Sequence, residues 1–185
     1  MPGATIRHLF DAPMPEAQGM ISTVRNSFVR IALLLGVATL AACGPAKKSV
    51  FPPSVTLQEV TARPGGVWHL TLRVRNNSYG GMSFEAFQGT LQVGNLAGVL
   101  LDAKVDQDIP SFAADVAKID LLPTPDMSKA LAELAAKGSS GSLPYAIEGT
   151  ITALPEQEKK PRTFEVHGRN WLSPVPGIPD TYRSP

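Results

Sequence analysis

The sequence predicts an all-β fold of about seven antiparallel strands with one short helix. Apolar and polar residues alternate from Trp68 to Arg75 and again from Tyr145 to Ile151, which is the period of strands with one buried and one solvated side. Clusters of Asn, Gly, Ser and Pro between such runs indicate turns. Apolar residues recur at helical spacing between Met127 and Leu134, and this predicts a single helix within the β pattern.

The chain begins with a predicted secretory signal. Residues 31–43, IALLLGVATLAAC, are apolar, follow Arg25 and Arg30, and end at the only cysteine. A basic segment, an apolar segment of about 12 residues and a small-residue site define a signal peptide, here residues 1–42. The segment that begins at Met20 is itself a compact signal precursor, so Met20 is predicted to be the true start. An uncleaved membrane anchor and a buried helix are the alternatives, but a span needs about 20 apolar residues and a core helix does not normally follow two arginines.

The end of this signal resembles the lipobox of bacterial lipoprotein precursors, whose four positions are here Leu40, Ala41, Ala42 and Cys43. In that family the cysteine receives a diacylglyceryl thioether, the peptide bond before it is cut, and the new amino terminus is often acylated, for example with palmitate. The resemblance implies that Cys43 is the first mature residue and anchors the protein to a membrane. Gly44, rather than Asp, after the cysteine implies export to the outer membrane, where the protein would face the periplasm.

The composition of the mature part narrows the range of functions that can be expected of it. Without residues 1–42 the chain keeps 143 of its 185 residues, the length of one domain, with 14 basic (17 less 3) and 14 acidic (16 less 2) residues. Nucleic-acid binding is not expected, because it requires clustered Lys and Arg. With Cys43 used by the lipid, no cysteine is left for an internal disulfide, a catalytic thiolate or a metal ligand.

Residues 43–53 are predicted to be a lipidated tether, because Gly, Lys and Pro block regular structure there. At ~3 Å per residue, this tether would hold a domain up to roughly 30 Å from the bilayer. Beyond it we expect a strand over 54–60, a turn over 63–66 and a strand over 68–75. In the second strand four apolar residues are predicted to face the core: Trp68, Leu70, Leu72 and Val74.

The middle of the chain continues the β pattern. A dense turn signal over 76–81 precedes a strand over 82–93, in which the alternation shifts by one residue near Ala86 and predicts a β-bulge or a strand edge there. Two further strands are expected within residues 96–101 and 111–122.

The last third of the chain contains the helix, predicted over 127–137, with Thr124 as its cap. Its apolar side is expected to cover an open end of the β domain. Strands are expected over 145–151 and around Phe164 and Val166. Residues 173–185 contain four prolines and are predicted to be a loosely held tail, which would limit the domain to residues 54–172.

Four motifs follow one another along the chain: a strand running into Asn76, Asn77 and Ser78; a strand with Phe84, Phe87 and Gly89; the helix; and a strand with Tyr145, Ile147 and Gly149. Their order resembles the late embryogenesis abundant (LEA) type 2 family, also called the water stress and hypersensitive response (WHy) domain. The resemblance covers about residues 55–166. The chain departs from the family at Asn77 and Ser78, where Pro and Asn are usual, so this turn is expected to be built differently.

The resemblance implies an immunoglobulin-like or fibronectin III-like antiparallel β-sandwich. It also implies a non-enzymatic domain that protects proteins or membranes under desiccation or other stress, so the expected partners are client proteins or lipid surfaces. The alternative is a periplasmic carrier or assembly factor that binds an apolar ligand or a protein strand at an open sheet edge. A pocket between the sheets would support the carrier, and a filled core would support protection.

The residues that could carry chemistry do not form a recognisable site, so we expect no enzyme, cofactor or metal. His69 and His167 lie on the polar side of their predicted strands and are expected at the surface. Asp102, Asp106 and Asp108 suggest a calcium loop, but they lack the Gly and the terminal Glu of an EF-hand, and a solvated loop is the preferred interpretation.

Overall fold

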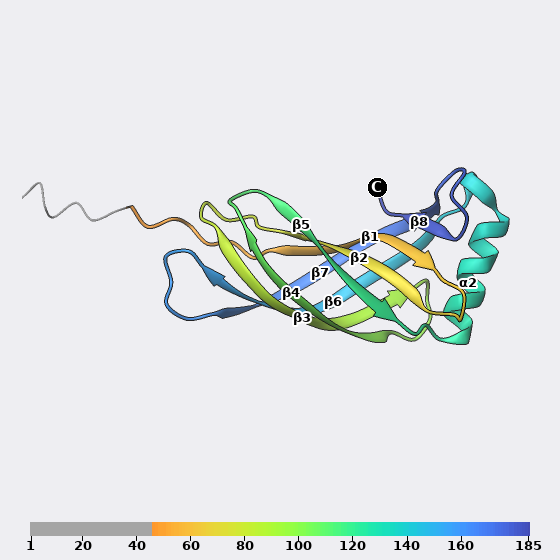
Figure 1. Ribbon diagram of the computed structural model, residues 1–185, viewed down its shortest axis with the longest axis horizontal. Coiled ribbons are helices and arrows are strands. Elements are labelled where there is room, and N and C mark those ends of the chain that lie inside the picture. Colours follow the sequence, from red (N-terminus) through yellow and green to blue (C-terminus); the bar gives the residue numbers. More distant parts are fainter. Residues whose placement is uncertain (1–45) are drawn as a thin grey trace, which may run out of the picture. The chain divides into compact units, whose positions relative to one another are not determined.

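The computed structural model describes residues 46–185, of which Lys47–Pro185 form one compact unit. The predicted signal peptide, Met20 and Cys43 lie outside the described residues. The described chain contains eight strands, one α-helix and one short 3-10 helix (Figure 1). They are β1 (Ser54–Ala62), β2 (Trp68–Arg75), β3 (Met82–Val93), β4 (Val99–Ile109), β5 (Ala114–Leu121), α2 (Pro125–Ala136), η1 (Gly138–Ser140), β6 (Leu143–Pro155), β7 (Arg162–Pro174) and β8 (Thr181–Arg183).

All eight strands belong to one antiparallel sheet with the order β4-β3-β6-β7-β8-β1-β2-β5. The two edge strands, β4 and β5, are consecutive in the chain, and the Gln107 side chain of β4 donates to the Val116 carbonyl of β5 at 2.8 Å. The sheet therefore curls until its edges approach each other, and it is nearly barrel-shaped. The predicted all-β class with one short helix is confirmed, with eight strands rather than about seven.

The side chains of β2 alternate between the core and solvent as predicted. Arg73 and Arg75 are exposed. The four apolar residues of the strand are at most 2% exposed: Trp68, Leu70, Leu72 and Val74. Because these residues share one parity, the sheet has an apolar inner side and a polar outer side.

Leu72→Ala is expected to lower the free energy of unfolding by about 2 to 5 kcal/mol, because it removes buried apolar surface and leaves a cavity. Arg73→Ala lies on the solvated side of the same strand, and its expected effect is below about 0.5 kcal/mol. Denaturant titrations of the two variants measure both effects. Equal losses would contradict the assignment of the two sides of β2.

The change of phase in β3 is a β-bulge, the first of the two expected alternatives, and β3 continues through it. Phe84 and Phe87 are both buried although three positions separate them, and the register with β4 and β6 shifts between Phe84 and Ala86. Opposite this point, Asp106 of β4 has a positive φ of 44°. The extra residue lets both phenylalanines reach the interior from one strand.

A tyrosine of β6 reaches β1 through the interior. The hydroxyl of Tyr145 donates to the Leu57 carbonyl at 2.9 Å and accepts from the Leu57 N–H at 3.2 Å. Burial raises the pKa of Tyr145, while the hydrogen bonds with Ser184 and Leu57 oppose that rise. This side chain therefore satisfies a buried backbone pair of β1.

The helix α2 has the predicted Thr124 cap, although it covers Pro125–Ala136 rather than 127–137. The Thr124 hydroxyl accepts from the Met127 N–H at 3.2 Å, Pro125 occupies the first turn, and Gly138 follows the helix with φ of 62°. Met127 and two leucines of α2 are buried in the core. The helix covers the end of the sheet opposite the entering segment 46–53 (Figure 1).

Three local predictions are wrong. β4 extends to Ile109, so Asp102, Asp106 and Asp108 lie on a strand and not in a loop, although their side chains are exposed as expected. Aspartate locally disfavours strands, but residues that alternate with the aspartates and Lys104 supply the buried side chains Leu101, Ala103 and Val105. β7 covers 13 residues, far more than the segment expected around Phe164 and Val166.

The third error concerns the tail 173–185, which is held firmly by the sheet. Its strand β8 pairs with β1 and with the end of β7. Thr181 and Tyr182 are buried, and the Tyr182 hydroxyl donates to the Leu131 carbonyl of α2 at 3.3 Å. The folded unit therefore includes residues beyond 172. A strand of three residues is too short for its alternation to be recognised among prolines.

Candidate functional site

The candidate site is the end of the sheet at which residues 46–53 enter, here called the tether end. It consists of that segment and of the loops 76–81, 110–113 and 156–161. Figure 1 shows these loops together at the end away from α2.

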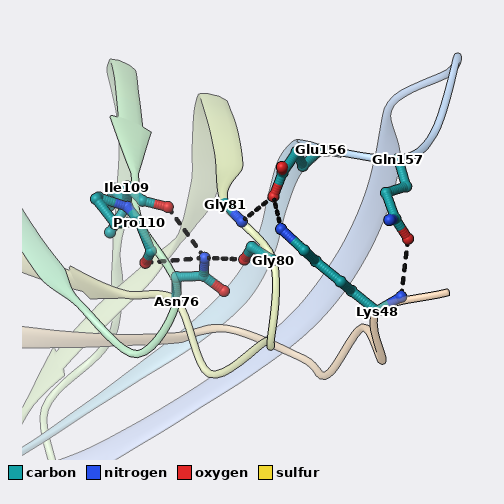
Figure 2. A network of polar contacts seen from close by, with 8 residues as sticks. All are labelled: Lys48, Asn76, Gly80, Gly81, Ile109, Pro110, Glu156 and Gln157. Atoms are coloured by element: carbon teal, nitrogen blue, oxygen red, sulfur yellow. Dashed lines mark hydrogen bonds and ion pairs between the residues drawn. The ribbon is translucent and has the colours of Figure 1, made fainter. Parts of the chain in front are cut away.

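Asn76 builds the centre of the tether end (Figure 2). Its side chain is fully buried, and its Nδ2 group donates to the carbonyls of Gly80, Ile109 and Pro110 at 2.8, 3.0 and 3.1 Å. Its Oδ1 accepts from the Ser78 N–H at 2.8 Å, which closes an Asx turn. One amide thus joins the loop after β2 to the loop after β4.

Asn77 and Ser78 hold residues 51 and 52 against the domain. Asn77 donates from Nδ2 to the Pro52 carbonyl at 2.9 Å. The Ser78 hydroxyl accepts from the Phe51 N–H at 2.9 Å and donates to the Phe51 carbonyl at 3.1 Å. The expected difference in this turn therefore has a structural role, because Asn77 and Ser78 fix residues 51 and 52 against the domain.

The loop after β6 binds an earlier residue of the tether, Lys48 (Figure 2). Lys48 Nζ lies 2.7 Å from Glu156 Oε2, and the Lys48 N–H donates to Gln157 Oε1 at 2.8 Å. Glu156 Oε2 also accepts from the Gly81 N–H at 3.0 Å. The hydrogen bond from Lys48, and then that from Gly81, holds the pKa of Glu156 below its ordinary value.

The Glu156 contacts are expected to be lost only in acid. Because the pKa of Glu156 is lowered in the folded chain, these contacts are complete above the ordinary value of 4.5 and are lost as the pH falls through the lower folded pKa. The Gly81 amide proton shift in an NMR titration reports this step. A midpoint at or above the ordinary value would contradict the contacts, and Glu156→Gln should abolish the step.

These contacts correct the expected length of the tether. The sequence predicts a tether over 43–53, but residues 48, 51 and 52 are bonded to the loops 76–81 and 156–161. Lys48 lies five residues after Cys43, so at most about 18 Å of extended chain separates the two. A lipid on Cys43 would hold the tether end far closer to a bilayer than the roughly 30 Å expected from composition.

Three aromatic side chains at the tether end are exposed and contact one another. Phe51, Tyr79 and Phe112 are 45%, 60% and 52% exposed. Their ring centroids lie 6.2 Å apart for Phe51 and Tyr79, and 4.9 Å apart for Tyr79 and Phe112 in an edge-to-face arrangement. We call these three residues the aromatic patch. The alternation and turn signals of the sequence did not predict this patch, although aromatic residues within predicted turns and a tether were a usable signal.

The histidines singled out in the sequence do not meet. His69 of β2 is partly exposed, and its Nδ1 contacts a carboxylate oxygen of Asp120 on the neighbouring β5. His167 is exposed on β7, opposite Glu148 of β6. They therefore contribute to different parts of the outer surface.

The three aspartates of β4 lie along the outer side of an edge strand. Asp106 forms an ion pair with Lys104, and the hydrogen bond to Asp106 raises the pKa of Lys104. Within residues 46–185, no group of three or more His, Cys, Asp or Glu residues is placed to hold a metal ion. No helix among the same residues is long and apolar enough to cross a membrane.

Two depressions lie at the surface away from the tether end. One, of about 390 Å³, lies between the end of α2 and residues 174–182. The other, of about 480 Å³, is lined by the ends of β3, β6 and β7, including Arg169 and Trp171. Both are shallow and open to solvent, and neither gathers a set of catalytic groups.

No protein-family model matches the chain, and a search of curated proteins gives no match. An X-ray structure of a Northeast Structural Genomics Consortium target is 12% identical with a TM-score of 0.40, covering 69% of this chain and 89% of that one. A crystal structure of a protein from Archaeoglobus fulgidus is 10% identical with a TM-score of 0.35, covering 69% and 100%. The solution structure of a candidate LEA protein is 13% identical with a TM-score of 0.37, covering 89% and 96%. Sequence identities and TM-scores this low support no conclusion about family or function.

Proposed function

We propose that this chain is a lipid-anchored, non-enzymatic envelope protein of the LEA type 2 (WHy) kind, which protects proteins or membranes during desiccation or a related stress. The ordered motifs from Asn76 to Gly149 support this family, and the lipobox-like site at Cys43 supports an anchor in the outer membrane. The observation that carries the protective role is the filled interior of the domain.

Side chains from all eight strands and from α2 fill this interior. The largest fully buried side chains include Trp68, Phe84 and Phe87. Beside them, the side chain of Tyr145 on β6 bonds through its hydroxyl to the Leu57 carbonyl of β1. Small-molecule carriers enclose most of their ligand in a concave pocket. A filled core therefore favours a domain that acts through its outer surface.

The outer surface carries mixed charges joined in pairs across strands. Arg169 contacts Glu148 at 3.0 Å, and Arg183 contacts Glu59 at 2.7 Å. Exposed pairs contribute little to stability individually, but a surface of interspersed charges stays hydrated and resists association. Such a surface suits a protein that must remain soluble and separate its neighbours as water is lost.

The edges of the sheet disfavour the carrier alternative, in which a partner strand would add to an open edge. β4 and β5 lie against each other, and Gln107 bonds across them. β4 also carries alternating charges and the bulged Asp106, features that discourage strand addition.

An immunoglobulin-like or fibronectin III-like relationship is part of the proposal. It is supported by the division of the pairing into β5-β2-β1-β8 and β4-β3-β6-β7, with the end of β7 joined to β8. In such folds two sets of strands pack face to face around one core.

A drying and rehydration assay tests the protective role. Residues 44–185 include the complete described core, so they can be purified without the anchor and mixed with a client enzyme. The expected result is higher recovered client activity than with an equal mass of an unrelated soluble protein. Equal recovery would overturn the proposal and leave the carrier as the better function.

A variant with His69, His167, Asp106 and Asp108 all changed to Ala tests whether particular polar groups matter. Its folding and its protection of the client enzyme are expected to stay almost intact, because a surface function depends on no single residue. Abolished protection by a folded variant would instead indicate a specific site.

Mass spectrometry of the membrane fraction tests the anchor. The expected mature protein begins at a lipid-modified Cys43 and fractionates with the outer membrane. An unmodified Cys43, a Cys43→Ser chain that is still cleaved and membrane-bound, or fractionation with the inner membrane would each contradict the corresponding part of the proposal.

A further inference from the structure

The aromatic patch brings together three segments that are distant in sequence. Phe51 comes from the tether, Tyr79 from the loop after β2, and Phe112 from the loop after β4. The tether is bonded beneath them through Ser78, and Tyr79 donates its N–H to the Ser49 carbonyl at 3.1 Å. The patch is therefore a fixed surface and not a set of independent side chains.

Phe112 is held in an unusual conformation. Its φ is 56°, a region that bulky residues rarely occupy. The loop that carries it is fixed on both sides of Phe112, because Asn76 donates from Nδ2 to the Pro110 carbonyl and from its N–H to the Ala113 carbonyl at 2.9 Å. A strained backbone that presents an aromatic ring to solvent is more typical of a functional surface than of a stability feature.

The loops around the patch carry an excess of positive charge. Segment 46–53 and loop 156–161 contain Lys47, Lys48, Lys159 and Lys160 against Glu156 and Glu158. Four positive charges against two negative charges leave an excess of two at the tether end, whereas the chain from residue 43 onward is neutral. Lysines beside exposed aromatic residues are typical of protein surfaces that contact anionic lipid headgroups.

We propose that the tether end is a membrane-contact surface, with the aromatic patch lying in the headgroup region of the bilayer that holds the Cys43 lipid. This inference rests on the proposed anchoring through Cys43. Only about 18 Å of chain can separate that residue from Lys48, so the patch is kept beside the bilayer at all times. Tyrosine and other aromatic side chains are favoured at this interface because one part of the ring system is apolar and its edge tolerates water.

The proposed contact can be tested with an artificial anchor. Cys43 is the only cysteine, so residues 43–185 can be coupled through it to a maleimide-headgroup lipid in phosphatidylcholine and phosphatidylglycerol vesicles. Brominated phosphatidylcholine chains then quench any indole close to the acyl region. Tyr79→Trp adds an indole at the patch, and its added emission is expected to fall by about half, as for an interfacial aromatic residue.

Matched controls lie at the opposite end of the unit. Ile178→Trp adds an indole at a side chain with 49% exposure, similar to that of the patch residues, and its emission should stay unquenched. Phe51→Ser with Phe112→Ser should reduce the quenching measured at position 79. Leu100→Ser with Leu122→Ser, which removes two exposed leucines elsewhere, should leave it unchanged. Near-ultraviolet circular dichroism verifies that each variant is folded.

Equal quenching at positions 79 and 178, or none at either, would overturn the proposal. If the indole at 79 is shielded from aqueous acrylamide but not quenched by lipid, the patch contacts another copy of this chain and the membrane proposal is likewise overturned. Because the coupling is chemical, such a failure would leave lipidation in cells and protection of client enzymes untouched.

Discussion

Gly149→Ala is expected to lower the free energy of unfolding by about 4 kcal/mol, and the variant is expected to fold poorly if at all. Gly149 of β6 lies directly opposite Gly89 of β3. A β-carbon on Gly149 would lie 2.5 Å from the Gly89 Cα and closer still to the Gln88 carbonyl oxygen. Backbone atoms of a central strand pair cannot give way as a flexible side chain can, so the sheet itself would have to shift.

Gly98→Ala is the matched control for this effect. A β-carbon there would have no neighbour nearer than 3.6 Å, and the expected change is below about 0.5 kcal/mol. Chemical denaturation followed by tryptophan fluorescence measures both variants. A Gly149→Ala variant as stable as Gly98→Ala would contradict the close approach of β3 and β6.

Asn76→Ala is expected to cost about 3 to 5 kcal/mol, because buried carbonyl groups lose their donor. The carbonyls of Gly80, Ile109 and Pro110 all accept from this one side chain. Asn76→Asp should be at least as harmful, since it keeps the acceptor for Ser78 but turns a charged oxygen toward those carbonyls.

Asn77→Ala is the comparison variant, because Asn77 holds the tether whereas Asn76 organises the loops after β2 and β4. Asn77 is bonded to Pro52 at a partly solvated site, and its removal is expected to cost only about 0.5 to 1 kcal/mol. Thermal melts of both variants provide the comparison. Similar losses for Asn76→Ala and Asn77→Ala would show that the buried amide does not organise the tether end.

The parts of the fold that the sequence predicted best are those with local signals. The alternation in β2, the shift of phase at Ala86 and the capped helix α2 each depend on residues close together in the chain. β4 was read too short because its aspartates suggested a loop, whereas burial of the alternate residues decided its structure. The strand β8 was missed because only its partners β1 and β7 make it recognisable.

The tether end was the least predictable feature. Its bonds join residues far apart in sequence, such as Phe51 with Ser78 and Lys48 with Glu156, and such pairs become visible only after the strands are paired. The sequence did mark Asn77 and Ser78 as unusual for the family it resembles. It could not reveal that these two residues fix the tether, nor that Phe51, Tyr79 and Phe112 meet.

The central claim, protection by a domain held at the membrane, is tested most directly by survival of a deletion strain after drying. The expected result is reduced survival, restored by the wild-type chain and restored much less by Cys43→Ser, with normal growth and envelope integrity before drying. Unchanged survival on drying, together with a constitutive envelope assembly defect, would contradict the claim and assign the chain to the carrier or assembly function.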